Sequence, residues 1–246
     1  MLGYKRQKIE RVGVQLKDFS NVPRLADMAY EAIHDAIVSK ALQPGSKLLV
    51  RDLAQRFGIS YTPVKEALVR LAGEGLVQIV PRKGAYVALL TIPDVVEIYE
   101  LREALEGLAA TKAVAMATED QLAKIAGYLN DGKLCIAGGE VKRYSDVDIL
   151  FHSAIAETGG NIRLLEALKK LQSQVRLLMA TSASLPGRPQ RSIQQHERIY
   201  EAIRRRDPNA ADDAAKHHVR EAREVIVSYL KTSEPTRSST VASFRS

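Results

Sequence analysis

Apolar residues in the first third of the chain recur every three or four positions, which predicts amphipathic helices. One such stripe covers residues 25–39. A shorter stripe predicts a helix over residues 51–57, which begins weakly because Leu49 and Val50 offer no capping side chain. Between the two, residues 42–48 are expected to form a turn.

A third helix is predicted directly after the second. Gly58 suits a helix end that needs a positive φ, and Ser60 is a good N-cap. Val64, Leu68 and Leu71 form one apolar face, so Tyr61, Thr62 and Lys65 are expected to be exposed on the other. Two helices joined by a tight glycine turn, with polar groups at the start of the second, are typical of a DNA-binding helix-turn-helix.

A hairpin is expected next, because residues 76–80 and 85–89 are rich in β-branched and aromatic residues. The turn between these strands contains Arg82, Lys83 and Gly84. Two cations at the tip of a hairpin after a helix-turn-helix indicate a wing that contacts phosphates or the minor groove.

From residue 94 onward the periodicity is helical, and no strand is expected. Breaks are expected at 131–132, 138–139, 159–160, 185–187 and 207–208. The predicted fold is therefore mostly α: a winged helix-turn-helix at 21–90 and an all-α antiparallel bundle at 94–231. A disordered basic arm at 1–20 and a disordered tail at 232–246 complete the chain. Six helices are predicted in the bundle: 94–116, 119–130, 139–158, 161–182, 190–206 and 208–231.

The positive charge is concentrated in the first part of the chain. Residues 1–91 contain 14 Lys and Arg against 8 Asp and Glu, whereas the other 155 residues contain 22 against 21. Nearly all of the net charge of +7 therefore lies in the segment with the helix-turn-helix, as expected of a domain that binds DNA.

Composition excludes several classes of protein. No apolar run is long enough to cross a membrane, and no signal peptide is expected at the N-terminus. A single cysteine, Cys135, excludes an intrachain disulfide framework and favours the cytoplasm.

Four residues in the bundle form a candidate metal site. Asp148 and His152 lie four apart, so a helix places both on one face. His196 and His218 fall on two later helices, as in metal sites within helical bundles. Spacing alone also fits a solvated Asp–His pair and two unrelated histidines. His34 and His217 are expected to be ordinary polar residues.

The chain resembles the GntR superfamily of bacterial transcription regulators, in its FadR-like branch with an all-helical FCD domain. The resemblance rests on two sets of residues. The N-terminal set is Pro44-Gly45, Leu48, Arg51-Asp-Leu-Ala54, Gly58-Ile-Ser60, Thr62-Pro-Val64, Glu66-Ala-Leu68, Arg70-Leu71, Glu74-Gly-Leu76 and Gly84-Ala-Tyr-Val87. The C-terminal set is Glu100-Leu-Arg102, Leu105-Glu106, Asp148, Phe151-His152, Gly160-Asn161, His196, Ile199, Ala202-Ile203, Asp207 and His218.

The resemblance implies a homodimer that binds double-stranded operator DNA and responds to a small carboxylate metabolite. It identifies Asp148, His152, His196 and His218 as the ligands of one divalent ion per chain. The ligand types favour Zn²⁺ or Ni²⁺, with Mn²⁺ as an alternative. Candidate effector-binding residues are Arg102, Asn161 and Arg176, and Arg102 fits a structural salt bridge equally well.

The helix-turn-helix and the wing predict a DNA-contacting set: Arg51, Ser60, Tyr61, Thr62, Lys65, Arg82, Lys83 and Gly84. Tyr61 replaces an arginine that is usual in the family. Because tyrosine cannot pair bidentately with guanine, the operator is expected to differ at that base.

Two alternative functions use the same residues. One is a metal-dependent hydrolase built on the Asp/His cluster, which needs a general base or nucleophile beside the metal. No His-Glu-x-x-His or Ser/His/Asp pattern supplies one, so an enzyme is not expected. The other is an architectural DNA-binding protein, which leaves the inward Asp/His set without a purpose.

Overall fold

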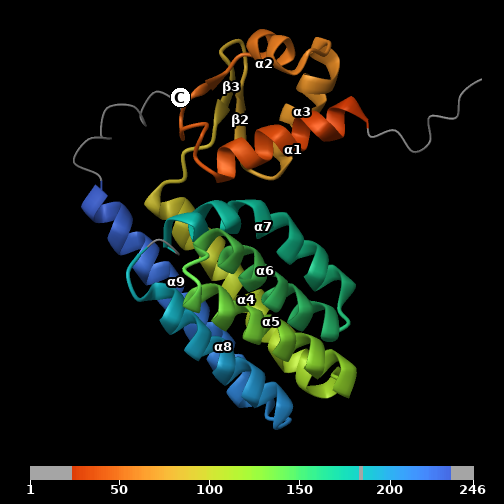
Figure 1. Cartoon of the computed structure of the whole chain (residues 1–246), viewed down its shortest axis with the longest axis vertical. Coiled ribbons are helices and arrows are strands. Elements are labelled where there is room, and N and C mark those ends of the chain that lie inside the picture. Colours follow the sequence, from red (N-terminus) through yellow and green to blue (C-terminus); the bar gives the residue numbers. More distant parts are fainter. Residues whose placement is uncertain (1–23, 183–184, 234–246) are drawn as a thin grey trace, which may run out of the picture.

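The computed structural model describes residues 24–182 and 185–233. A small winged helix lies at one end of a larger bundle of helices (Figure 1). This architecture confirms the predicted mostly α fold with a small β wing. The basic arm expected at 1–20 and most of the expected tail lie outside the described residues. The last helix extends through Thr232 and Ser233, the first two residues of that expected tail.

The winged helix is built from three helices and a small antiparallel sheet. Its strands lie in the order β1-β3-β2, and Val77 pairs with Val87 while Ile79 pairs with Ala85. Its core includes the predicted apolar face of the third helix, since Val64, Leu68 and Leu71 are all buried. Its elements are α1 (Leu25–Val38), β1 (Lys47–Leu48), α2 (Val50–Phe57), α3 (Tyr61–Gly73), β2 (Val77–Val80) and β3 (Gly84–Val87).

Local sequence signals explain most of the boundaries in this domain. Gly58 ends α2 with a φ of 66°, as predicted, and Leu49 begins it without a side-chain cap. One element was not expected: Lys47 and Leu48 form β1, where the sequence predicted only a turn. This strand is two residues long and exists through its pairing with the distant β3, so no local pattern indicates it.

The bundle consists of helices alone in the described residues from 92 to 233. The helix α4 begins with the expected cap, because the Thr91 side chain and Asp94 form a reciprocal capping box with Pro93 in the first turn. The helices are α4 (Ile92–Met116), α5 (Glu119–Ala137), α6 (Val141–Thr158), α7 (Ile162–Ser182), α8 (Arg188–Arg204) and α9 (Pro208–Ser233).

The predicted break at Asp131-Gly132 is wrong, because α5 continues through both residues to Ala137. Gly132 is buried, and a Cβ built on it would lie 2.8 Å from Cδ1 of Ile193 on α8. This glycine therefore permits close packing of two helices and does not end one.

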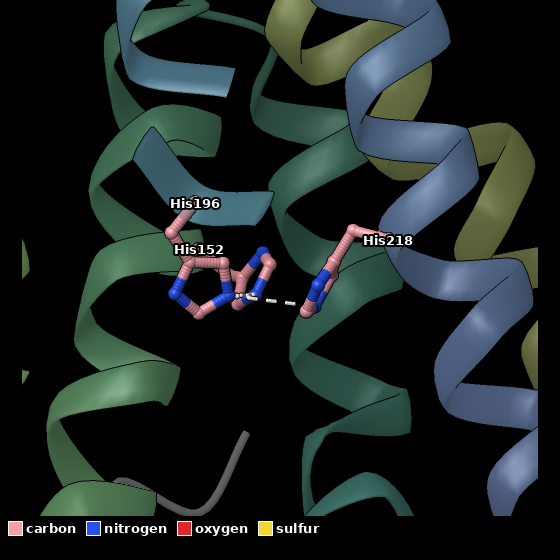
Figure 2. Close-up of side chains that lie close together, drawn as sticks. All are labelled: His152, His196 and His218. Carbon is pink, nitrogen blue, oxygen red and sulfur yellow. Dashed lines mark hydrogen bonds between the residues drawn. The ribbon is translucent and has the colours of Figure 1, made fainter. Parts of the chain in front are cut away.

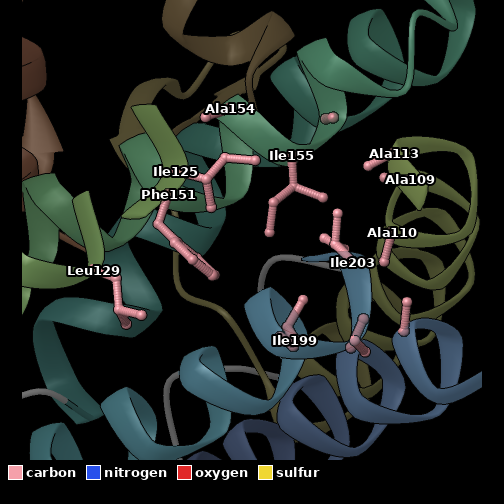
Figure 3. Close-up of a cluster of buried hydrophobic side chains, with 14 of the residues drawn as sticks. Ala109, Ala110, Ala113, Ile125, Leu129, Phe151, Ala154, Ile155, Ile199 and Ile203 are labelled. Atoms are coloured by element: carbon pink, nitrogen blue, oxygen red, sulfur yellow. The ribbon is translucent and has the colours of Figure 1, made fainter. Parts of the chain in front are cut away.

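The main core of the bundle consists of small residues of α4 and larger apolar side chains of α5, α6 and α8. Figure 3 shows Ala109, Ala110 and Ala113 facing Ile155 and Ile203. Fully buried alanines let α4 lie deep in the bundle against its neighbours. In the part of the chain that the structure describes, no helix is long and apolar enough to cross a membrane.

The helix α7 contributes side chains to the core of the winged helix and to a core of the bundle. Leu177 belongs to the core of the winged helix, although it lies on a bundle helix. Val175, Leu178 and Met179, on the same helix, belong to a bundle core that also includes Tyr99 of α4. Figure 1 shows α7 at the end of the bundle that faces α1.

Candidate metal centre and nucleic-acid interface

The predicted DNA-contacting residues are all exposed, as contact with DNA requires. Arg51 lies in the first turn of α2, where its Nε is 3.2 Å from Oδ1 of Asp52. Ser60 is the N-cap residue of α3, although its side chain makes no capping hydrogen bond. The others are Tyr61, Thr62 and Lys65 at the start of α3, Arg82 and Lys83 in the turn between β2 and β3, and Gly84, the first residue of β3.

Three histidines from three different helices point their Nε2 atoms at one another in the centre of the bundle (Figure 2). Nε2 of His196 on α8 lies 3.2 Å from Nε2 of His152 on α6 and 3.4 Å from Nε2 of His218 on α9. The ligand nitrogens of all three lie within 4.8 Å of one another. The structure therefore brings together residues that are 44 and 22 positions apart in the chain.

Asp148 lies beside this cluster, one turn before His152 on α6. Its Oδ1 is 3.5 Å from Nε2 of His196, and its Oδ2 is 3.7 Å from Nε2 of His152. The Tyr144 hydroxyl donates a hydrogen bond to Oδ1 at 3.2 Å and so orients the carboxylate. All four residues predicted as metal ligands thus lie together.

The outer nitrogens of two imidazoles are held by buried polar groups. Nδ1 of His152 is 2.7 Å from Oε2 of Glu106 on α4, and Nδ1 of His218 is 3.0 Å from Oε1 of Gln195 on α8. In a neutral imidazole, donation from Nδ1–H to a carboxylate or amide oxygen leaves Nε2 unprotonated, with its lone pair directed inward.

The orientation of the Gln195 amide is fixed independently of His218. Its Nε2 donates to Oε2 of Glu221 at 2.5 Å, and its Oε1 accepts from Nη1 of Arg188 at 3.2 Å. The oxygen therefore faces His218, which must donate from Nδ1. At least two of the three clustered nitrogens then present lone pairs, a combination that favours a cation between them.

Burial keeps two of these histidines uncharged. It lowers the pKa of His196 and the pKa of His218 well below the ordinary value, and the neighbouring imidazoles lower both further. Neutral imidazole is the form that binds a metal ion, so these two need not lose a proton first. Burial by itself raises the pKa of Glu106, but Arg102 and His152 lower it to about 2, so this carboxylate is charged.

The spacing of the nitrogens fits a zinc-like ion. Metal–nitrogen bonds of about 2.0–2.1 Å in a tetrahedral arrangement place neighbouring ligands about 3.3–3.4 Å apart. The two measured Nε2–Nε2 distances are 3.2 and 3.4 Å. Three imidazoles and one carboxylate are also a donor set that Zn²⁺, Ni²⁺ and Mn²⁺ accept.

Two small cavities flank the cluster, and Arg102 and Asp148 line both. The larger, about 50 Å³, lies between α4, α6 and α7 and is also lined by Glu106 and His152. The smaller, about 20 Å³, is also lined by His218. A small molecule in either cavity would touch the candidate metal ligands.

The three predicted effector-binding residues have different surroundings. Arg102 is buried and pairs through its Nε with Oε1 of Glu106, so its charge is already neutralised. Asn161 accepts a hydrogen bond from the amide of Leu164 at 3.2 Å and so caps α7. Arg176 pairs with Asp146 at the edge of the bundle. Each has an intramolecular partner, and their binding of an effector stays a prediction.

Sequence reasoning did not select Glu106 and Gln195 as site residues. Glu106 belongs to the Leu105-Glu106 part of the family motif, and a charged residue in the buried stripe of α4 is a signal that could have identified it. Gln195 precedes a candidate ligand in sequence, and its role depends on contacts with α9 that no local pattern shows.

His217 is exposed and His34 lies on α1, near Asp35, as expected of ordinary polar residues.

Two family models match the chain and together cover most of it. The model "Bacterial regulatory proteins, gntR family" matches residues 25–87, and the model "FCD domain" matches residues 97–221. The second match covers half of the chain and includes the whole histidine cluster.

Several known proteins are similar over most of their length. The HTH-type transcriptional repressor RspR of Escherichia coli is 27% identical over 80% of this chain and 86% of that protein. The HTH-type transcriptional regulator LutR of Bacillus subtilis is 29% identical over 77% of this chain and 95% of that protein.

Solved structures have the same fold. McbR/YncC of E. coli has a TM-score of 0.69 at 22% identity, over 86% of this chain and 99% of that chain. A putative GntR regulator from Rhodococcus sp. RHA1 has a TM-score of 0.70 at 23% identity, over 82% of this chain and 97% of that chain.

Proposed function

Because this chain belongs to the GntR family of bacterial regulatory proteins, with an FCD domain, and is a transcriptional regulator, we propose that a small carboxylate effector controls its binding to operator DNA. The effector binds inside the bundle, at a divalent metal ion held by Asp148, His152, His196 and His218. Zn²⁺ or Ni²⁺ is the preferred ion, and Mn²⁺ is the alternative.

One observation carries this proposal: three imidazoles, two of them buried and one partly buried, converge through Nε2, and Glu106 and Gln195 hold the Nδ1 atoms of two of them. Burying so many polar groups costs free energy of folding unless each finds a partner. A metal ion supplies that partner, and its open positions accept a carboxylate oxygen. Hydrogen bonds from outer residues to imidazole Nδ1 are usual around metal-binding histidines.

The chain is proposed to act as a homodimer. Each protomer has one recognition helix, α3, so a specific operator needs two half-sites related by a twofold axis. Sedimentation of the protein, free and with a pseudo-palindromic duplex, tests this. A monomer in both conditions contradicts it.

The decisive experiment measures affinity for operator DNA by fluorescence anisotropy in three states of the full chain. These are protein reconstituted with zinc, the same protein after treatment with a chelator, and zinc-loaded protein with a screened carboxylate. Thermal shift against a panel of carboxylates identifies the effector, because a ligand of the folded state raises the melting temperature. The proposal predicts an effector that changes DNA affinity only when zinc is present.

The alternatives give different results in the same assay. An architectural DNA-binding protein keeps the same DNA affinity in all three states. A metal-dependent hydrolase turns over a substrate in the zinc-loaded state, and the matched relatives, named as transcriptional regulators, do not favour it.

A further inference from the structure

The smaller cavity beside the histidine cluster is lined by a buried cation that has no acidic partner in the part of the chain that the structure describes. Arg188, the first residue of α8, lines this cavity and is only 7% exposed. Its Nη1 donates to the neutral oxygen of Gln195 at 3.2 Å. Among the described residues, no carboxylate oxygen lies within 4.0 Å of its side-chain nitrogens. Arg102, which is equally buried, has Glu106 as its counter-ion.

A buried tyrosine hydroxyl lines the same cavity. Tyr99 on α4 is 1% exposed, and among the described residues its hydroxyl makes no hydrogen bond of normal geometry, although the Arg102 guanidinium lies near it. A buried hydroxyl without a partner and a buried guanidinium without a counter-ion each cost free energy of folding. One acidic group in this cavity would accept hydrogen bonds from both and remove both costs.

Charge balance indicates how many acidic groups the site can take. Around the two cavities the buried charges are Arg102 and Arg188, which are positive, and Glu106 and Asp148, which are negative, so these four cancel. Lys169 also lines the larger cavity, but its side chain is exposed and its charge is screened by solvent. The divalent ion of the proposed function would then leave an excess of two positive charges. A dianion neutralises that excess, whereas a monocarboxylate leaves a net buried charge.

We propose that Arg188 and Tyr99 form a second anion-binding subsite, which makes the effector a small dicarboxylate and not a monocarboxylate. This inference rests on the proposed function. One carboxylate binds at the histidine cluster, and the other accepts hydrogen bonds from Arg188 and Tyr99. Cavities of about 50 and 20 Å³ restrict the molecule to a short carbon chain.

The test compares dicarboxylates with monocarboxylates of the same chain length on the full chain reconstituted with zinc. Malonate, succinate and glutarate are titrated by calorimetry against propanoate, butanoate and pentanoate, at matched ionic strength. At least one dicarboxylate should bind about tenfold more tightly than its monocarboxylate, as expected for added hydrogen bonds to a charged group.

Two variants assign the difference to the subsite. Arg188→Gln and Tyr99→Phe should weaken the dicarboxylate, the first by about tenfold, and leave the monocarboxylate within about twofold. Arg191→Gln is the matched control, because Arg191 lies one turn further along α8, is exposed and pairs with Glu221. It should change neither class. Bound zinc, measured for every variant, should stay equal to that of the unsubstituted protein.

The outcomes separate this inference from the function on which it rests. If monocarboxylates bind as tightly as dicarboxylates, or if Arg188→Gln weakens both classes equally, the subsite is wrong while the carboxylate-responsive regulator stands. If no carboxylate of either class binds the zinc-loaded protein, both proposals are overturned.

Discussion

Glu74, at the end of the recognition helix, accepts a hydrogen bond from the Ser173 hydroxyl of the bundle helix α7 at 2.6 Å. The Tyr30 hydroxyl, on α1, donates to the same carboxylate at 2.9 Å. Since Gln172 and Val175 on α7 line the larger cavity, one helix touches both the candidate effector site and the DNA-binding domain. This places α7 where a ligand in the bundle can affect the orientation of the winged helix.

Removing the Ser173 hydroxyl should loosen the contact between the two domains. Ser173→Ala deletes one hydrogen bond to a charged group, which stabilises by about 1.5–3 kcal/mol. We expect faster hydrogen exchange at the junction of α3 and β2. Ser145→Ala is the control, because Ser145 donates only to Val141 of its own helix. Equal exchange in the two variants would show that Ser173 does not hold the domains together.

Gly75 should tolerate a side chain less well than Gly45, because a Cβ at Gly75 would require the Gln174 side chain to move. Both have a positive φ, 72° and 79°, so alanine costs about 1–2 kcal/mol of unfolding free energy at either position. Only at Gly75 would the Cβ meet Nε2 of Gln174, at 2.2 Å. Gly75→Ala should therefore lower the urea midpoint more than Gly45→Ala, and adding Gln174→Ala should remove the difference. Without that rescue, the close approach of α7 is not the cause.

His218 and His217 are neighbours in sequence with opposite expected roles. His218 is buried in the histidine cluster, whereas His217 is exposed. After zinc reconstitution, elemental analysis should find about one equivalent in His217→Ala and less than about a tenth in His218→Ala. The melting temperature should respond to a chelator only in His217→Ala, because metal binding ties three helices together. Equal zinc contents contradict the proposed site.

The metal-free protein should lose stability in mild acid. Burial lowers the pKa of His196 and His218 in the folded state, while the unfolded chain titrates near the ordinary value of about 6.5. Below pH of about 6.5 the unfolded state binds more protons, so the unfolding free energy falls by up to about 1.4 kcal/mol per pH unit for each histidine. Above it, these two groups contribute no pH dependence.

Urea unfolding with excess chelator, at pH of about 5 and about 7.5, measures this effect. A midpoint that is the same at both pH values would mean that the two buried histidines titrate normally.

Arg82 in the wing should contribute to DNA affinity without sequence preference. Replacing it with alanine should weaken binding to specific and random duplexes alike and reduce the slope of log K against log salt by about 0.9, if it contacts one phosphate. Lys142→Ala removes an exposed cation from α6 in the bundle and serves as the control. An unchanged slope for Arg82→Ala, or an equal loss for both variants, rules out a phosphate contact by the wing.

The sequence by itself determined most of the helices, the helix end at Gly58, the cap at Thr91 and the change from a winged helix to a bundle of helices. These depend on local features: apolar periodicity, Gly58 at a positive φ and the Thr91–Asp94 capping box all act within a few residues. It also indicated Asp148, His152, His196 and His218, since the first two share a helix face and the family resemblance supplied the rest.

Only the tertiary structure decided the features that depend on distant partners. The strand β1 needs β3, and Gly132 lies within α5 because Ile193 packs against it. Glu106 and Gln195 orient imidazoles from other helices. Arg102 has a carboxylate partner, whereas Arg188 has none among the described residues. The physical reason is that hydrogen bonds and ion pairs between helices depend on their packing, whereas periodicity reports only which face of a helix is buried.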